Sequence, residues 1–398
     1  MTESARRIPQ LDGIRGTAIL LVVVWHFIVV PIARAPQPGV FARLIAHAGL
    51  LMWSGVDLFF VLSGFLIGGI LFDAKDSSNY FSTFYLRRVF RILPIYLVVV
   101  VAYLLLWSLA AGRQTTLRET LGSPMPWYVY FTFTQNFWLA HHAWDAVYLT
   151  LSWSLAVEEQ FYLLLPAIIR LLPRFWLLPA AVALAFGSVA ARSLMYVHYG
   201  PSWGTAAYTL IVSRADALML GVICSVLLRD AYCKEILTEN TWIIRTFFGI
   251  FAFGVAVLTY KGWGAGTMPM CTLGFTCVAL FYASLLMIAM VSQEGILSRA
   301  FRIRWLMWLG TIAYALYLFH EIILDAVFRL LLHHAPVMAN GFDALAALLS
   351  FVLALCLALV SWKYFESKLV RIGHRFAYGN RPTSRPRGPN LLAPRNSN

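Results

Sequence analysis

The chain has 398 residues, of which 60% are hydrophobic and 12% are charged, and its mean hydropathy is +0.73. Soluble domains carry about 25% charged residues, so this composition excludes an ordinary soluble protein and predicts one embedded in a bilayer. The formal net charge of +13 does not indicate nucleic-acid binding, because the basic residues are scattered over many short loops and the C-terminal end, as membrane orientation requires.

Apolar runs of about 20 residues, the length that spans a hydrocarbon core, recur along the whole sequence. They predict an all-α, polytopic membrane protein with about ten transmembrane helices. The expected spans are residues 12–32, 50–72, 93–111, 150–172, 176–198, 208–228, 243–261, 269–291, 305–331 and 342–364. A cytoplasmic N-terminus places 22 of the 31 Lys and Arg residues in cytoplasmic segments and seven outside. The positive-inside rule therefore predicts cytoplasmic N- and C-termini.

Outside the spans, the sequence predicts little independent structure. We expect one domain over residues 1–372 and a disordered cytoplasmic tail over 373–398, where Pro, Arg, Asn and Ser are frequent. Residues 73–92 combine aromatic residues with three arginines and predict an interfacial amphipathic helix. The aromatic segment 112–149 is expected to cover the outer mouth of a cavity. The five cysteines lack CxxC spacing and predict neither a disulfide framework nor a metal site.

The first two spans contain polar residues that a membrane tolerates poorly. A charge at the bilayer centre costs at least roughly 2.5–3.5 kcal/mol and persists where it faces a protein interior or a wet cavity. Arg15 and His26 are eleven residues apart in the first span, hence on nearly the same helix face and about 16 Å apart. Asp57 lies near the outer end of the second span, and Ser63 lies deeper. Orientation and helix packing are the structural alternatives for these positions, except that Asp57 is hard to explain by packing.

The third and fourth spans add two further polar motifs. Arg88 and Arg91 are three residues apart in RRVFRILPIY and thus adjacent on a helix. They form either a solvated positive-inside cluster or a phosphate clamp, because the forked donors of Arg match phosphate oxygens. In SWSLAVEEQFYLLLP, Ser154, Glu158 and Tyr162 share one helix face. A buried carboxylate at this position needs a cation, a proton or hydrogen-bond donors.

Polar residues continue in the later spans, with Arg214 in the sixth and Tyr314, Tyr317 and His320 in the ninth. A structural polar network between helices explains either set alone, but together with the earlier motifs they are too many for a passive bundle. The assigned helix directions place the titratable groups in the middle to outer half of the membrane. The arginines of the first and third spans lie at the cytoplasmic end. This arrangement predicts a cavity for a phosphate-bearing donor that enters from the cytoplasm.

With these motifs, the chain resembles the acyltransferase-3 family of integral membrane acyltransferases over about residues 8–371. The matching elements are Arg15 and His26 with ten residues between them, FFVLSGF at 59–65, RxxRxxP at 88–94, WSLxxE at 153–158, and the Tyr314, Tyr317 and His320 pattern. The late acidic motif YFESKLVR, residues 364–371, departs from the family pattern at Ser367. Some family members carry an additional SGNH hydrolase-like domain. We expect this chain to be the stand-alone form, in which the acceptor meets the donor in the membrane domain.

The resemblance implies a membrane O-acyltransferase of the bacterial cytoplasmic (inner) membrane. It would move an acyl group, by family habit acetyl, from cytoplasmic acyl-CoA to a hydroxyl of a glycan or glycolipid. No bound cofactor is expected, because acyl-CoA serves as a co-substrate. A macrolide or another secondary metabolite is the alternative acceptor, and a membrane transporter is the alternative from another class.

The resemblance also implies roles for individual residues. Arg15, Arg88 and Arg91 would bind the phosphates of the donor. His26 would act as a general base or as a transient acyl carrier, and Glu158 would orient or charge-stabilise it. The residues expected to bind substrate are Asp57, Ser63, Ser154, Arg214, Tyr314, Tyr317 and His320.

Overall fold

The computed structural model describes residues 8–110, 121–142, 144 and 149–379. Every regular element within these ranges is a helix, so the predicted all-α architecture is confirmed for this part of the chain. The predicted disordered tail from residue 380 onward lies outside the described residues, as do parts of the aromatic connection 112–149.

The helices fall into two runs along the chain. Those up to residue 227 are α1 (Pro9–Val24), α2 (Val30–Ala33), α3 (Val40–Ala48), α4 (Gly55–Ala74), α5 (Tyr80–Ala110), α7 (Trp127–Phe131), α8 (Gln135–His142), α9 (Ser152–Leu171), α10 (Arg174–Tyr199), α11 (Gly204–Thr209) and α12 (Ile211–Leu227). The rest are α13 (Ala231–Glu239), α14 (Thr241–Tyr260), α15 (Phe275–Val291), α16 (Ile296–Phe301), α17 (Arg304–Thr311), α18 (Ala313–Val327), α19 (Gly341–Ser361) and α20 (Ser367–His374). Short π-helical turns occur at Trp25–Val29, Met270–Gly274, Phe328–Leu332 and Trp362–Glu366.

Local sequence explains several helix boundaries. Pro9 occupies the first turn of α1, where its missing N–H costs nothing. α19 begins with a capping box, in which the Asn340 side chain accepts from the backbone of Asp343 and the Asp343 side chain accepts from the backbone of Asn340. Gly200, with a φ of 71°, ends α10 in a backbone conformation that favours glycine.

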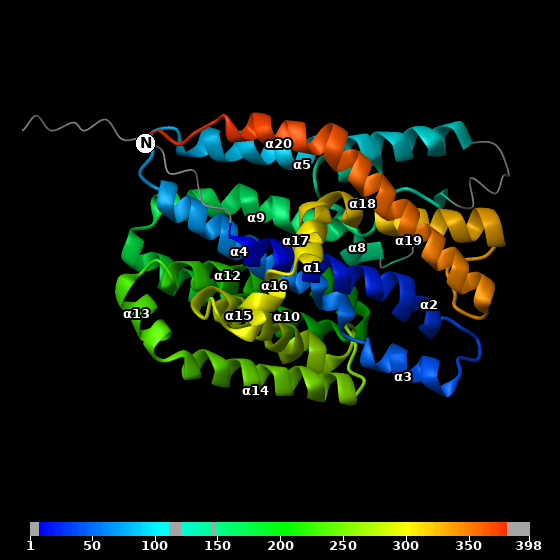
Figure 1. The fold of residues 1–398 in the computed structure, drawn as a ribbon, viewed down its shortest axis with the longest axis horizontal. Helices are drawn as coiled ribbons and strands as arrows, with labels where there is room; N and C mark the ends of the chain where they lie inside the picture. Colours follow the sequence, from blue (N-terminus) through cyan, green and yellow to red (C-terminus); the bar gives the residue numbers. More distant parts are fainter. Residues whose placement is uncertain (1–7, 111–120, 143, 145–148, 380–398) are drawn as a thin grey trace, which may run out of the picture.

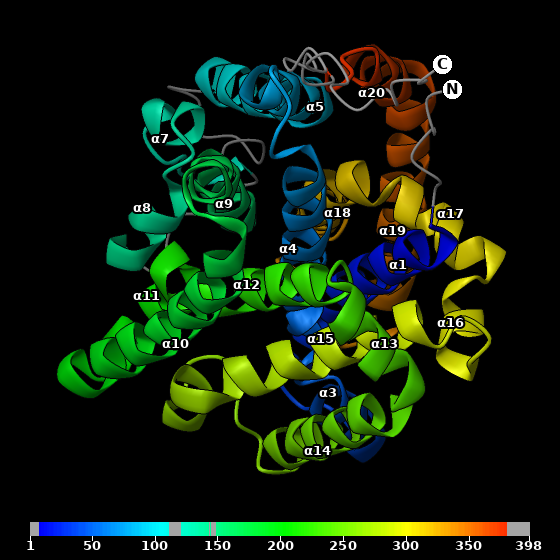
Figure 2. The ribbon, with the colours of Figure 1, turned by 90° about the vertical axis from the view of Figure 1, so that its left-hand side faces the viewer.

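The long helices run along the longest axis of the molecule (Figure 1). Viewed end-on, α4 lies in the middle of the bundle, while α5 and α14 lie at opposite edges (Figure 2). Glycines set the close approach of α4 to α12. A Cβ added at Gly64 would lie 1.9 Å from the backbone oxygen of Leu218, and one at Gly221 would lie 2.0 Å from that of Val61. The interpretation of Gly64 as a packing residue is therefore confirmed.

Seven helical segments are long and apolar enough to cross a membrane, by length and composition, within the described residues. They are Pro9–Ala33, Val40–Ala74, Tyr80–Ala110, Arg174–Tyr199, Thr241–Tyr260, Met270–Val291 and Gly341–His374. An eighth results if Pro201–Thr209 and Ile211–Leu227, which are bent by 42°, form one span. The protein is thus a multi-pass membrane protein. The count of about ten spans and the side on which the termini lie stay predictions.

Some expected elements are built differently from the prediction. The expected interfacial helix at 73–92 and the expected span at 93–111 form one continuous helix, α5, which contains Pro94. The prediction of a separate interfacial helix is wrong here, because membrane helices tolerate an internal proline when neighbouring groups satisfy the freed carbonyl. The expected span at 305–331 is broken at Ile312 into α17 and α18.

The end of the described chain packs against the start of α5. The Arg87 side chain donates from Nε to the backbone oxygen of Phe376 at 2.7 Å. The Asn79 side chain donates to the backbone oxygen of Ala377 at 2.8 Å and accepts from the backbone N–H of Gly379 at 2.7 Å. The predicted domain boundary at residue 372 therefore falls inside a packed segment that continues to Gly379.

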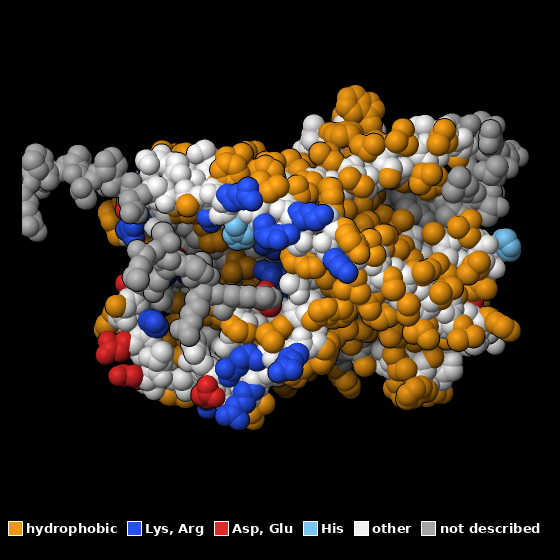
Figure 3. Space-filling view, turned by 45° about the horizontal axis from the view of Figure 1, so that its top comes forward, with side chains coloured by type: hydrophobic (Ala, Val, Ile, Leu, Met, Phe, Trp, Pro, Cys, Tyr) orange, Lys and Arg blue, Asp and Glu red, His pale blue; other side chains and the backbone are white. Residues whose placement is uncertain are grey.

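The face that carries α5 and α20 divides into two halves along the long axis. Lys and Arg side chains gather on the half toward the beginning of α5, and the other half is almost entirely hydrophobic (Figure 3). Exposed leucines of α5 and α19, including Leu105, Leu109 and Leu353, belong to the apolar surface of the bundle. A surface of this kind is matched to lipid rather than to water.

Candidate functional site: two cavities along four helices

Two cavities lie inside the bundle, and the same four helices line both. The basic cavity, of about 270 Å³, is lined by Arg15 of α1, Ser63 of α4, Glu158 of α9 and Tyr314 of α18, among others. The aromatic cavity, of about 650 Å³, is lined by neighbouring parts of the same chain segments. Val56 lines both cavities. The cavities are therefore arranged one after the other along the helix axes, separated at Val56 by a single side chain.

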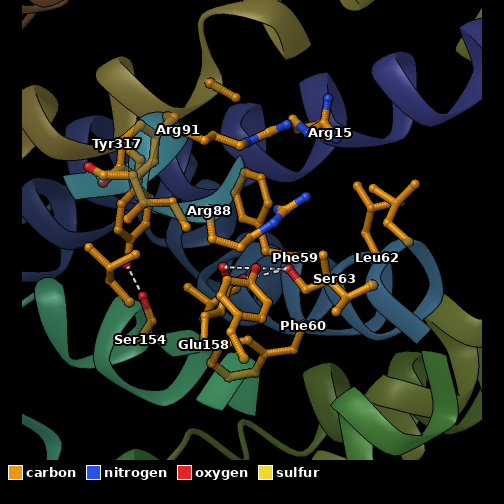
Figure 4. A pocket seen from close by; sticks show the side chains of 18 of the residues that line it. Arg15, Phe59, Phe60, Leu62, Ser63, Arg88, Arg91, Ser154, Glu158 and Tyr317 are labelled. Carbon is orange, nitrogen blue, oxygen red and sulfur yellow. Dashed lines mark hydrogen bonds between the residues drawn. The ribbon is translucent and has the colours of Figure 1, made fainter. Parts of the chain in front are cut away.

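Three arginines enter the basic cavity from two helices. Figure 4 shows Arg15, from α1, and Arg88 and Arg91, from α5, reaching into it. Arg15 pairs with Asp12 at 3.0 Å. Arg88 and Arg91 make no ion pair or hydrogen bond with another described residue, although Arg88 lies against the rings of Phe84 and Tyr162. Cationic groups without a carboxylate partner make this cavity suitable for an anion.

Across the basic cavity, the Glu158 carboxylate is held by two hydroxyl groups (Figure 4). Ser63 donates to its Oε1 at 2.8 Å, and Tyr162 donates to its Oε2 at 2.8 Å. The Ser63 and Tyr162 hydroxyl oxygens are 3.1 Å apart. These partners come from α4 and from the next turn of α9, so they fix the carboxylate while leaving it at the cavity wall. The predicted shared face of Glu158 and Tyr162 is present in the structure.

Two tyrosines of α18 complete the wall of the basic cavity. The Tyr317 hydroxyl lies 2.6 Å from the Ser154 Oγ and donates to the backbone oxygen of Leu151 at 3.0 Å. The Tyr314 hydroxyl donates to the backbone oxygen of Ile92 at 3.0 Å. Each tyrosine thus ties α18 to another helix or to the start of one, which holds the wall in place.

His26 and His320 form a pair beyond this wall. The His320 Nδ1 lies 2.8 Å and 3.1 Å from two backbone carbonyl oxygens of its own helix, so in the neutral ring it carries the proton and Nε2 has a lone pair. The His26 Nδ1 lies 2.8 Å from the backbone oxygen of Val22 and 3.4 Å from the His320 Nε2, both of which are acceptors. The neutral His26 therefore carries its proton on Nδ1. Its Nε2 remains available as a base in the aromatic cavity, which His26 lines.

Glu158 does not contact His26 in the structure. The sequence predicts that Glu158 orients this histidine, but its partners are Ser63 and Tyr162 in the basic cavity. The side chain that contacts His26 is His320, which is fully buried. The difference arises because His26 lies farther along the helix axes than Glu158, beyond the wall that contains Tyr317.

The aromatic cavity combines indole rings with charged side chains. Trp25, Trp53, Trp144 and Trp153 contribute aromatic surface, and the phenol of Tyr208 adds to it. The charged residues of the lining are Arg34, Glu321, Asp325 and Arg329. Trp144 belongs to the connection 112–149, so part of the segment expected to cover a cavity does line one.

Asp57 and Arg214 lie in neither cavity. They form a buried ion pair between α4 and α12, and both side chains are at most 1% exposed. Arg214 also packs on the Phe275 ring, 4.3 Å from its centre. The prediction that these two residues bind substrate finds no support in this geometry, because each charge is already paired and out of reach. A structural pair between two helices is the alternative that the sequence left open.

The sequence interpretation missed a second buried arginine. Arg192 of α10 is fully buried and pairs with Asp216 of α12 at 3.1 Å. It also donates to the Thr276 hydroxyl at 2.7 Å and to the backbone oxygen of Cys271 at 3.0 Å. An isolated arginine in an apolar run was the available signal, since such a residue needs a partner in the membrane interior.

No group of three or more His, Cys, Asp or Glu side chains that could hold a metal ion occurs within the described ranges. The polar groups of the two cavities are instead suited to bind and orient organic ligands. An anion would lie among the arginines, and a second ligand would lie against the indole rings and the free nitrogen of His26. The fold and the site thus define a multi-pass membrane protein with adjoining binding sites inside its helical bundle.

Comparison with known families identifies this class more closely. The model of the acyltransferase-3 family, described as an acyltransferase domain, matches residues 8–363. The chain belongs to this family, as its motifs predict. No solved structure gives a significant match.

Curated relatives include two peptidoglycan-modifying proteins. The peptidoglycan O-acetyltransferase OatA of Listeria monocytogenes serovar 1/2a is 28% identical over 348 residues, a match that covers 80% of this chain and 49% of the relative. The O-acetyltransferase OatA of Staphylococcus aureus strain NCTC 8325 is 25% identical over 395 residues, covering 94% of this chain and 59% of the relative. The chain thus spans roughly half the length of these relatives.

Proposed function

We propose that this protein transfers an acyl group from acyl-CoA to a hydroxyl of a glycan or glycolipid. The observation that carries the proposal is the pair of cavities along α1, α4, α9 and α18, one basic and one aromatic. Such a pair allows two ligands of different chemistry to approach one wall from opposite sides. Family membership and the O-acetyltransferase names of the relatives support an acyl group, and specifically acetyl, as the group transferred.

The donor occupies the basic cavity in this proposal. The phosphates of CoA bind Arg15, Arg88 and Arg91, because Arg presents forked donors to phosphate oxygens. The pantetheine arm extends past Ser63 and Glu158 toward Ser154 and Tyr317. The basic half of the molecule faces the cytoplasm of a bacterial inner membrane, in agreement with the positive-inside rule.

The acceptor occupies the aromatic cavity. Indole rings pack against the C–H faces of sugars, and carboxylates such as those of Glu321 and Asp325 accept hydrogen bonds from sugar hydroxyls. A cavity of about 650 Å³ has room for a ligand of sugar size. The relatives are named for peptidoglycan or for O-acetylation, which also favours a glycan acceptor.

The chemical step begins at His26. Its Nε2 takes the proton of the acceptor hydroxyl while the oxygen attacks the thioester carbonyl. The C–S bond then breaks, CoA leaves as a thiol after taking a proton, and an ester remains on the acceptor. His320 positions His26 by accepting from its Nδ1–H, which keeps the lone pair on Nε2. General base catalysis of this kind contributes about 10²–10⁴-fold.

The test is release of free CoA thiol by the purified protein in lipid nanodiscs, with acetyl-CoA and candidate acceptors. We expect acceptor-dependent thiol release, a loss of at least about 100-fold in kcat for His26→Ala, and a raised KM for acetyl-CoA in Arg88→Gln. His333→Ala, at an outward-facing histidine beyond α18, is the matched control. Wild-type rates in His26→Ala at equal expression would refute the assigned base. Uptake of a substrate without thiol release would instead identify a transporter.

A further inference from the structure

A third, smaller cavity adjoins the basic cavity where α20 crosses the start of α5. It encloses about 70 Å³, and we call it the annex. Its polar lining consists of Arg87, Arg88 and Arg91 of α5, His374 of α20, and Tyr378. Arg88, Arg91 and His374 also line the basic cavity, so the two spaces are neighbours. Arg87 and Tyr378 belong to the annex alone.

The annex holds polar atoms that lack partners. The Arg88 Nε and the Tyr378 hydroxyl are buried and have no hydrogen-bond partner among the described residues. A buried polar group without a partner costs about 1–3 kcal/mol, so such groups commonly mark a site that a ligand or water completes. Both atoms can donate, and neither faces an acidic residue of the lining. The ligand that satisfies them is therefore an acceptor.

The segment after α20 is fastened in a way that keeps the annex in shape. The Arg87 Nε donates to the backbone oxygen of Phe376 at 2.7 Å, and its guanidinium lies 5.1 Å from the centre of the Tyr378 ring. The Phe376 ring stacks on Phe90 with a centroid distance of 5.9 Å. Gly373 packs against α5, where an added Cβ would lie 3.2 Å from the Phe90 Cβ. These contacts place the Tyr378 hydroxyl at the annex wall without using its hydrogen.

The size and charge of the annex select one kind of ligand group. Three guanidinium groups, an imidazole and a phenol surround a volume too small for a nucleobase but large enough for one phosphoryl group. A phosphate monoester carries up to two negative charges and three terminal oxygens, which match forked donors. A diphosphate in the basic cavity would leave this space to a separate phosphate.

We propose that the annex binds the 3′-phosphate of the CoA donor, with Arg87, His374 and Tyr378 as recognition residues. This inference rests on the proposed function, since it assigns a part of the same donor. CoA has a phosphate monoester on its ribose, apart from the diphosphate that connects to pantetheine. The adjoining positions of the annex and the basic cavity suit these two anionic groups of one molecule. The segment after α20 is then part of the donor site rather than a free tail.

The experiment compares acetyl-CoA with acetyl-3′-dephospho-CoA, which lacks only this phosphate. In the wild type, we expect a KM for the dephospho donor that is roughly ten-fold higher or more, the factor for one hydrogen bond to a charged group. Tyr378→Phe keeps the ring on Arg87 and removes the hydroxyl, so the KM ratio falls several-fold. In Arg87→Gln the ratio approaches one. Arg371→Gln, which removes an exposed charge of α20 outside the annex, retains the wild-type ratio.

Binding of CoA and 3′-dephospho-CoA, measured by calorimetry in nanodiscs, gives the same comparison without turnover. Equal affinity of the two in the wild type overturns the annex assignment and leaves the proposed function standing. Equal weakening of both ligands by Tyr378→Phe also overturns it, because that outcome indicates a structural role. If phosphatidate in the nanodiscs competes with CoA in the wild type but not in Arg87→Gln, the annex belongs to a lipid headgroup and the assignment fails. Absence of binding by either CoA form would reject the donor itself.

Discussion

Removal of Asp57 separates a structural role from a substrate-binding role at a position that the sequence assigned to substrate. Asp57→Asn leaves the Arg214 guanidinium without its counter-ion at 0% exposure. The Arg214 Nε and Nη1 already lack hydrogen-bond partners, so only the rings around it offset the buried charge. Breaking a buried pair from one side costs about 3–5 kcal/mol. We therefore expect a lower free energy of unfolding by about this amount.

The measurement is the unfolding midpoint in detergent, followed by tryptophan fluorescence with increasing denaturant. Asp76→Asn is the matched control, because it breaks an ion pair with Arg174 in which both side chains are about half-exposed, and it should change stability by at most about 1 kcal/mol. The double variant Asp57→Leu with Arg214→Met should recover most of the loss, because it leaves no buried charge. A wild-type midpoint in Asp57→Asn together with a raised acceptor KM would refute the structural role.

Three further outcomes follow from the contacts described. Gly64→Ala forces a Cβ against the backbone of α12 and should reduce the folded yield in membranes, whereas Gly249→Ala, where an added Cβ meets nothing within 4 Å, should leave the yield unchanged. Ser63→Ala removes one of the two hydroxyls that donate to Glu158. It should lower kcat/KM for acetyl-CoA by roughly ten-fold, the value of one hydrogen bond to a charged group, and an unchanged kcat/KM would argue against a role for this carboxylate. Glu321→Gln should raise the KM of a glycan acceptor but not that of the donor, as steady-state thiol release would measure; a change confined to the donor KM would contradict the assignment of the aromatic cavity.

The sequence could predict those features that depend on spacing along one helix. Arg88 and Arg91 lie three residues apart on α5 and reach the same cavity, and Glu158 shares a face with the residue one turn later, as expected from helical periodicity. The all-α architecture followed from the recurrence of apolar runs. These features need only local geometry and composition.

Contacts between helices could not be obtained in this way. Periodicity indicates which face of a helix a residue occupies, but not which helix that face meets. The sequence therefore assigned Glu158 to His26, although Ser63 of α4 holds the carboxylate and His320 of α18 contacts the histidine. It also left Arg192 without a role, since its partner Asp216 lies on another helix.

The two cavities explain why a single helix carries both Arg15 and His26. Eleven residues of α-helix rise about 16 Å and return to nearly the same face, so α1 places a cation in the basic cavity and a base in the aromatic cavity. His26 lies on the π-helical turn Trp25–Val29, and Val30, four residues later, lines the same cavity. Four residues overshoot a full α-helical turn by about 40°. The wider π-turn reduces this offset, which aligns His26 with the residues that follow it and keeps the helix facing the aromatic cavity beyond the base.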